Sequence, residues 1–394
     1  MIERVPGTSR SDLASALGFS EMAATRIVRE LLAAGLVEEF ESPGKTRKKK
    51  RSVGRPKTGL RIVPARIFAV GITVSAYHSE VSICDAAGEI RANRMVLNPP
   101  FETPESAARV YAEAVRLLIE EADVDLERII GIGIALSART DPDRCEILRS
   151  EYFGWANDGG RFCSEIRKFI DLPIEIENIA NALAIAEMRF GAAREASAFA
   201  LVHAATFVGA SIVSENRIVR GATGVSGLIG HFRSTPTELT CVCGRSDCLN
   251  LNATGFGVLG RLGLLDEPSF DNAHLSYYAG TLLEVLSNQT ATGLVSEAGA
   301  CLAPAIDNIG KLLGPEMVIV SGQLGSDAIY FDGVKRALET HYDLGSDAAF
   351  RLVRGTIRPE RSAALLALHT FCYSDRLDYD RLVDTAAPRS SARG

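Results

Sequence analysis

Residues 230–248 form the segment that most restricts how this chain can fold. It begins with Gly-His, continues through nine other residues and ends in Cys-Val-Cys-Gly-Arg-Ser-Asp-Cys. Three thiolates and one imidazole make the closed tetrahedral shell of a structural zinc site. A glycine after the second cysteine permits the tight turn that such a shell needs. The segment therefore predicts a structural Zn²⁺ ion with four ligands: His231, Cys241, Cys243 and Cys248. The alternative is a loop of free cysteines beside an unrelated core histidine.

The same segment resembles a known family. A Gly-His pair followed by C-x-C-G-x-x-x-C is similar to the zinc module of ROK proteins, a group of bacterial repressors and sugar kinases. Further matching segments are Tyr152-Phe-Gly-Trp155, Gly221-Ala-Thr-Gly224 and Gly314-Pro-Glu-Met-Val-Ile-Val-Ser-Gly322. The resemblance extends over nearly the whole chain. It implies an α/β body with the actin-like (ribonuclease H-like) duplicated ATPase fold.

Length and cysteine usage limit the class of protein. A chain of 394 residues is too long for one core, and 46% hydrophobic with 23% charged residues is a globular composition. No positively charged start leads into an apolar run, and no apolar stretch is long enough to cross a bilayer, so we expect neither a signal peptide nor a membrane partner. We expect a reducing, cytoplasmic location, where the scattered cysteines are buried small hydrophobic residues. These are Cys84, Cys145, Cys163, Cys301 and Cys372.

Charge is divided unevenly along the chain. Residues 1–65 hold 13 Lys+Arg and 7 Asp+Glu, whereas the remaining residues hold 30 and 42. A basic head on an acidic body predicts that the head alone meets a polyanion. Eight of the basic residues fall within positions 45–57, which contain no acidic residue. Such runs are most often solvated, but beside a DNA-binding helix they neutralise phosphates.

The head has the pattern of a winged helix-turn-helix. Ser9–Gly18 predicts a short capped helix that ends at its glycine, and Ser20 can cap a second helix over Glu21–Ala34. Leu36–Phe40 begins a strand, and Leu60–Val63 would return beside it. Helix, tight turn, helix and strand are the elements of this motif. The alternative is a small helical hairpin that serves dimerisation.

The second helix of such a motif lies in the major groove with its N-terminal residues against base edges. We therefore predict base contacts from Ser20, Glu21, Ala23, Ala24, Thr25 and Arg26. Phosphate contacts are expected from Arg29, Lys48, Lys49, Lys50 and Arg51. The segment Gly54-Arg55-Pro56 resembles an element that follows the wing in ROK repressors, and Arg55 would then enter a narrow A·T minor groove. Each of these side chains could equally be an ordinary solvent-facing residue.

One departure from the family concerns the start of the head. ROK repressors normally have a complete helix ahead of the segment that matches Ser9–Gly18, whereas only Met1–Gly7 precede it here. We expect either that this first helix is missing or that the true start lies upstream.

From residue 66 onward, apolar strands alternate with amphipathic helices. We expect strands at 67–74, 80–84, 90–97, 129–136, 174–177, 199–203, 208–213 and 317–320. We expect helices at 105–121, 162–170, 178–190 and 327–339. The pattern is used twice, as in the duplicated ATPase fold. The predicted domains are a head at 1–65, a first lobe at 66–190, a second lobe with the zinc module and dimerisation helices at 191–380, and a disordered tail at 381–394.

The resemblance also implies that kinase chemistry is lost. ROK kinases place a general base in a Glu-Asn-Asp-x-Asn segment, which here reads Glu-Asn-Ile-Ala-Asn and puts Ile179 at the base position. The first phosphate loop, normally Asp-x-Gly-x-Thr, is represented by Val70–Val74 and lacks the acid. The second, normally Gly-Thr-Gly-x-Gly, carries Phe207 where glycine backbone would approach the anion. Leu228, Asn250 and Leu136-Ser137 replace residues of the sugar site.

Only Asn178 and His231 remain of the hexose contacts, and they are candidate effector-binding residues. We predict a DNA-binding transcriptional regulator, specifically a ROK-type repressor that is not an enzyme. It would bind a double-stranded operator as a homodimer or dimer of dimers and respond to a sugar-like or other small effector. One alternative is a dead-kinase scaffold whose basic head binds nucleic acid without specificity. An active sugar kinase is the least supported function.

Overall fold

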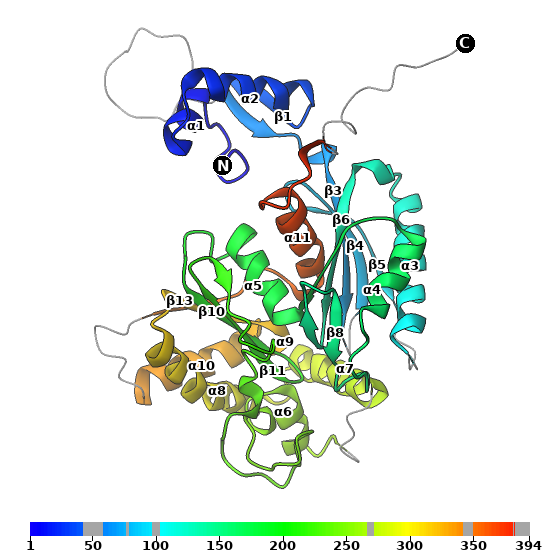
Figure 1. The fold of residues 1–394 in the computed structure, drawn as a ribbon. Helices are drawn as coiled ribbons and strands as arrows, with labels where there is room; N and C mark the ends of the chain where they lie inside the picture. The colour runs from blue at the N-terminus through cyan, green and yellow to red at the C-terminus, as the bar shows by residue number, and fades with distance from the viewer. Residues whose placement is uncertain are drawn as a thin grey trace.

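The computed structural model describes residues 1–41, 58–75, 79–96, 103–265, 272–341, 350–380 and 382. In these parts of the chain a small N-terminal head stands on a larger body, and the body has two lobes that are each built on a five-stranded sheet (Figure 1). The helices α5 (Ile179–Phe190) and α11 (Pro359–Cys372) lie between the two sheets. The body therefore has its own core, separate from that of the head.

The head contains α1 (Arg10–Leu17), α2 (Glu21–Ala33), β1 (Val37–Glu41) and β2 (Thr58–Ile62). Both helices begin at a serine whose side chain accepts a backbone N–H of the first turn; for α1 this is Ser9, and for α2 it is Ser20. Gly18 ends α1 with a positive φ of 68°. The two strands pair antiparallel. The predicted order of helix, turn, helix, strand and returning strand is confirmed.

The basic run at 45–57 joins β1 to β2 and lies outside the described residues. The DNA contacts assigned to five of its members stay predictions. These members are Lys48, Lys49, Lys50, Arg51 and Arg55.

The first lobe has the strand order β5-β4-β3-β6-β9. Its strands are β3 (Phe68–Val74), β4 (Ser79–Asp85), β5 (Ile90–Val96), β6 (Ile129–Leu136) and β9 (Ile174–Asn178). The helices α3 (Pro104–Glu121) and α4 (Arg161–Phe169) pack on one face through a shared apolar cluster. On the other face α11 lies so close that a Cβ atom at Gly133 would be 2.0 Å from the carbonyl oxygen of Ala363. A glycine is needed at that position because no side chain fits there.

The second lobe has the strand order β12-β11-β10-β13-β14. Its strands are β10 (Phe199–Ala204), β11 (Val208–Ser214), β12 (Arg217–Ile218), β13 (Met317–Ser321) and β14 (Arg351–Arg354). In both lobes three successive strands are antiparallel and two further strands join in parallel. The faces are covered by α5 on one side and, on the other, by α6 (Gly255–Arg261), α7 (Asn272–Asn288), α8 (Thr292–Leu313) and α10 (Ala328–His341). The repeated strand plan confirms the predicted duplication.

Several features of the body were not predicted, among them the helices α6, α7, α8 and α11 and the strands β12 and β14. A small hairpin of β7 (Arg139–Asp141) and β8 (Glu146–Arg149) follows β6, and the short helix α9 (Gly322–Gly325) follows β13. Cys145 in the hairpin turn and Cys163 on α4 form a disulfide with their Cα atoms 6.4 Å apart. The expectation that both are separate small hydrophobic residues is wrong, because the fold brings together positions that lie 18 residues apart in sequence.

The predicted disordered tail is represented only by Leu382, which is buried in the apolar cluster around α11. The rest of residues 381–394 lies outside the described parts of the chain. Among the helices that the structure describes, none combines the length and the apolar character needed to cross a bilayer.

The head contacts the body through few polar groups. The Glu3 carboxylate, whose side chain is 7% exposed, lies 3.6 Å from Arg189 Nε and 3.5 Å from an Arg194 guanidinium nitrogen. Arg66, just beyond β2, donates to the carbonyl oxygen of Ala34 at 3.2 Å. Glu3 thus connects the start of the chain to the end of α5.

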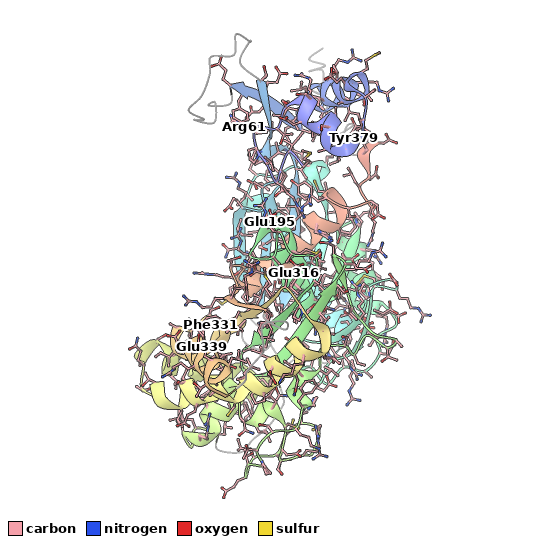
Figure 2. All side chains as sticks on the ribbon, turned by 90° about the vertical axis from the view of Figure 1, so that its left-hand side faces the viewer. Arg61, Glu195, Glu316, Phe331, Glu339 and Tyr379 are labelled. Carbon is pink, nitrogen blue, oxygen red and sulfur yellow. A yellow bond between two sulfur atoms is a disulfide. The ribbon has the colours of Figure 1, made fainter. Side chains whose placement is uncertain are left out.

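Between these contacts, the head and the body enclose an apolar cavity of about 280 Å³. Leu17 and Ile27 line it from the head, and Tyr373 and Tyr379 line it from the segment at and beyond the end of α11. Figure 2 shows Tyr379 beside the head helices. The junction is therefore apolar but incompletely filled.

Candidate functional site

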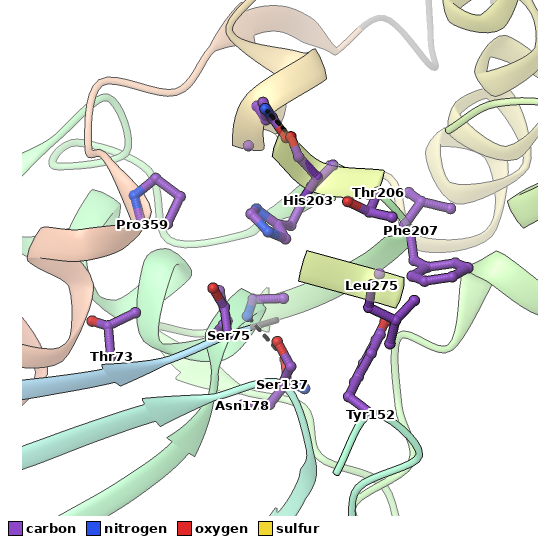
Figure 3. Close-up of a pocket in the computed structure, with 18 of the residues that line it drawn as sticks. Thr73, Ser75, Ser137, Tyr152, Asn178, His203, Thr206, Phe207, Leu275 and Pro359 are labelled. Carbon is purple, nitrogen blue, oxygen red and sulfur yellow. Dashed lines mark hydrogen bonds between the residues drawn. The ribbon is translucent and has the colours of Figure 1, made fainter. Parts of the chain in front are cut away.

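A cleft of about 840 Å³ lies between the two lobes (Figure 3). The ends of β3, β6 and β9 line it from the first lobe, and the β10–β11 turn and α7 line it from the second. Ligands of open α/β folds bind outside the carboxyl ends of such strands. This cleft is therefore the candidate binding site.

Ile179 occupies the wall of the cleft at the start of α5 and is 5% exposed. Its side chain cannot accept a proton from a substrate hydroxyl group. The preceding carboxylate, Glu177, is buried and forms an ion pair with Arg220. Burial is the main cause of the raised pKa of Glu177, which the Arg220 charge partly offsets. Glu177 thus links β9 of the first lobe to the loop that follows β12 of the second.

Phe207 lies in the β10–β11 turn, at the position expected for a phosphate loop. Its ring centroid is 5.6 Å from that of Tyr152 and 5.5 Å from that of Phe256. Tyr152 belongs to the first lobe and the other two rings to the second, so the rings contact each other across the cleft (Figure 3). An aromatic side chain therefore takes the place where backbone N–H groups would meet a phosphate.

Two of the asparagines that line the cleft are engaged in structural hydrogen bonds. Asn178 accepts from the backbone N–H of Ala180 at 2.8 Å, which caps α5, and donates to the carbonyl oxygen of Ala138 at 2.9 Å. Asn250 accepts from the backbone N–H of Val208 at 3.0 Å. Both residues line the cleft, but part of each amide is already used to hold the backbone.

His203 was not anticipated as a site residue. It lies near the end of β10, and its ring projects into the cleft (Figure 3). Among the described residues, its Nδ1 atom is buried without a hydrogen-bond partner. Burial lowers the pKa of His203 to about 4, so the ring is neutral at neutral pH. The only sequence signal for His203 is its position at the end of an apolar segment. Many histidines in protein cores have such a position, so this signal does not identify a site residue.

The predicted zinc ligands converge on one point. His231 Nδ1 is 3.6 Å from Cys241 Sγ and 3.8 Å from Cys248 Sγ, and Cys243 Sγ is 3.4 Å from Cys248 Sγ. Tetrahedral Zn²⁺ with ordinary Zn–S and Zn–N bonds separates its ligand atoms by roughly 3.3–3.8 Å. All four ligand atoms lie within 4.8 Å of one another. The donor set and its spacing therefore fit a zinc ion.

The local backbone explains this convergence. Gly244 has a φ of 84°, and its N–H donates to the carbonyl oxygen of Cys241 at 2.7 Å. Although burial alone would raise it, hydrogen bonds led by the Arg245 backbone and side chain lower the pKa of Cys243 to about 6. A thiolate is the form that binds metal.

The predicted DNA-contacting residues on α2 are mostly solvent-facing. Five are exposed, namely Ser20, Glu21, Thr25, Arg26 and Arg29, and Ala23 is half-buried. Ala24 is only 2% exposed. Its predicted base contact is wrong, because its side chain faces the apolar interior of the head on the same side of the helix as Val28.

A single helix links the cleft to the head. The first residues of α5 line the cleft, whereas Arg189 near its other end is paired with Glu3. The Arg189 guanidinium also lies 4.2 Å from the ring centroid of Tyr373. Arg189 is therefore held between the head and the end of α11.

Comparisons with known proteins agree with this architecture. The ROK family profile matches residues 69–353. The DNA-binding transcriptional dual regulator NagC of Escherichia coli (strain K12) is 21% identical over 353 residues, covering 86% of this chain and 83% of NagC. The xylose repressor of Bacillus subtilis (strain 168) is 25% identical over 316 residues, covering 80% of this chain and 78% of the repressor.

Two solved structures share the fold. A ROK family transcriptional regulator described as a homologue of the E. coli MLC protein superposes with a TM-score of 0.70 at 20% identity, covering 96% of this chain and 93% of that chain. The ROK family glucokinase from Streptomyces griseus, in complex with glucose and AMPPNP, gives a TM-score of 0.62 at 21% identity. That match covers 76% of this chain and 98% of the kinase.

Proposed function

Because the chain belongs to the ROK family, we propose that it is a DNA-binding transcriptional repressor whose body has no kinase activity. One observation carries the proposal: a two-helix head with an exposed second helix is joined to a body in which Ile179 stands at the position of the general base. The relatives named as a DNA-binding transcriptional dual regulator and as a xylose repressor match more than three quarters of this chain.

The proposed DNA interface is the exposed face of α2, with Thr25 and Arg26 toward the bases and Arg29 toward the phosphates. Two heads of a homodimer would read half-sites about 34 Å apart, one turn of the double helix. The zinc ion would have a structural role, because protein ligands fill all four positions and leave none for a reactive water molecule.

Genome-wide footprinting of the intact protein, followed by competition with random duplex, tests the proposal. Specific operators bind ~10³-fold or more tightly than non-specific DNA. The Arg29→Ala variant should weaken binding to operator and random duplex alike and lower the salt dependence, because a phosphate contact carries no sequence information. Arg167→Ala, an exposed arginine on α4 of the body, is the matched control.

Two outcomes would contradict the proposal. Equal affinity for operator and random duplex would instead favour a scaffold with a non-specific basic head. Phosphorylation of any hexose at the expense of ATP would show that the cleft retains catalysis without a base at position 179.

A further inference from the structure

We propose that the cleft binds a compact ligand with an aromatic or branched aliphatic end and an uncharged hydrogen-bonding group that meets His203. This inference rests on the proposed function, because it names the chemical class of effector that the repressor would sense. The proposed ligand differs from the monosaccharide and the nucleotide that a kinase of this fold binds in its cleft.

The apolar end of the cleft is formed by side chains from both lobes. Tyr152, Phe207 and Leu275 gather on one side of the cleft (Figure 3). Leu228 and Leu283 also line the cleft and are 48% and 42% exposed, so the protein leaves their apolar surface uncovered. Covering such surface with an apolar group is favourable, whereas a sugar hydroxyl placed there would lose its hydrogen bonds to water.

The other side of the cleft carries hydroxyl groups, including Thr73 and Ser75, and His203 stands between the two sides (Figure 3). A neutral imidazole offers one donor and one acceptor. The Nδ1 atom lies beside Gly322, where an added Cβ atom would be 2.9 Å away. A buried nitrogen without a partner among the described residues favours a ligand with one complementary polar group.

Three of the polar side chains that line the cleft are already engaged within the protein. The amides of Asn178 and Asn250 hold backbone groups, as described above. Glu151, a carboxylate at the cleft, lies 3.0 Å from Arg149. A site that recognises several hydroxyls needs free polar partners for each of them.

Calorimetric titration of the full-length protein with matched probes tests the inference. Benzamide and 1-naphthamide carry an aromatic end and an uncharged amide, acetamide lacks the aromatic end, and D-glucose and AMP-PNP represent the kinase ligands. We expect the aryl amides to bind at least tenfold more tightly than acetamide, with 1-naphthamide the tightest. Tighter binding of D-glucose or AMP-PNP, or no saturable binding of either aryl amide, would overturn the inference.

Variants locate the binding site. Leu228→Glu places a charge on the apolar wall and should weaken 1-naphthamide at least tenfold. His203→Phe keeps an aromatic ring but removes the hydrogen-bonding nitrogens, so it should weaken the binding of benzamide and leave the binding of toluene, which lacks the amide group, unchanged. Leu312→Ala changes an 83% exposed residue of α8 that does not line the cleft, and it should bind like the parent protein. Unchanged affinity in both cleft variants would show that the probes bind elsewhere.

Operator binding by the unliganded protein is measured in parallel, and it separates the two proposals. Loss of operator recognition with intact aryl amide binding would contradict the repressor alone. Intact operator recognition without aryl amide binding would contradict the ligand class alone. Melting temperatures of all variants check that they are folded.

Discussion

The head and the body differ in how much of their structure each holds by itself. In the head, the buried apolar cluster consists of Leu13, Val28 and Leu60, with Ile2 and Leu32 packed against it. In the body, each sheet is sandwiched between helices in clusters several times larger. Small cores leave little net stability after the cost of ordering the chain. We therefore expect the body to fold without the head, and the head to depend on its junction with the body for stability.

The largest predicted effect concerns the metal site of the body. The Cys248→Ser variant removes a buried thiol of the proposed zinc site, and metal-binding free energy is folding free energy where the ligands assemble only in the native state. We expect zinc content to fall to background and the melting temperature of the body to fall by at least about 10 °C. Cys301→Ser, in α8 of the same lobe, should change neither quantity. A metal-free variant with the melting temperature of the parent protein would contradict a stabilising role for zinc at this site.

Glu187 provides the next largest effect. Its buried carboxylate accepts the backbone N–H groups of Ala192, Thr356 and Ile357 and the hydroxyl of Thr356. Glu187→Ala leaves several buried donors unpaired and should lower the free energy of unfolding of the body by about 3–4 kcal/mol in urea denaturation. Glu195→Ala, at an exposed position shortly after α5 (Figure 2), should stay within about 0.5 kcal/mol. A similar loss of unfolding free energy in both variants would show that the hydrogen bonds of the Glu187 carboxylate do not stabilise the body.

Two partly buried histidines predict a pH dependence of stability. Burial lowers the pKa of His203 to about 4, and burial together with the Arg189 and Arg4 charges lowers that of His369 to about 4. Between pH 4 and about 6.5 the unfolded chain binds more protons than the folded one, so stability rises with pH across this window and is lost as pH falls. Each histidine should contribute on the order of 3 kcal/mol to the total change in the free energy of unfolding across this window.

Unfolding free energies measured from pH 4 to pH 7 check this, with His203→Gln and His369→Gln each expected to flatten the curve. Since His203 lies in the cleft and His369 lies on α11 beneath the head, the two variants report on different regions. A slope that neither variant changes would mean that other groups cause it.

A substitution in the core of the head should destabilise the head and leave the body unchanged. Val28 is fully buried in its small cluster, and Val28→Ala should destabilise the head by about 2 kcal/mol. Hydrogen exchange would then show lower protection in α1 and α2 and unchanged protection in the sheets of the body. Met22→Ala, at an 85% exposed position of the same helix, is the control. Equal loss of protection in the head and in the body would mean that they unfold as one unit.

The smallest predicted effect is at a helix cap. Ser20→Ala removes the side-chain acceptor for the backbone N–H of Ala23 and should cost about 1 kcal/mol. Hydrogen exchange at the start of α2 should rise, whereas Ser11→Ala in the first turn of α1 should leave α2 unchanged. An unaltered exchange rate at Ala23 would show that the cap is not needed.

Much of this architecture could be predicted from the sequence, because local signals agreed with the tertiary structure. Apolar runs gave the strands β3, β6 and β9, serines marked the caps of α1 and α2, and the Cys/His spacing gave a compact ligand cluster. The duplication of the fold in two lobes was predicted from the family resemblance, because no local sequence pattern indicates it.

Other features depend on packing between distant segments and left no local signal. The Cys145–Cys163 disulfide needs α4 to lie against the β7–β8 hairpin. The helix α8 contains Pro304, which normally argues against a helix interior, and its long apolar face overrides that preference. An alanine such as Ala24 is common on both the buried and the exposed face of a helix, so the sequence does not show which face it occupies. The fold places it on the buried face. His203 could be recognised as a candidate site residue only from the cleft that it lines.

The helix α5 has one further consequence. It has 12 residues and is about 18 Å long, and it starts at the cleft and ends where Arg189 meets Glu3. If α5 moves as a rigid body, a molecule that displaced Ile179 would also displace Arg189 and the Glu3 carboxylate paired with it. Occupancy of the cleft and the orientation of the N-terminal helices would then be coupled through this one helix.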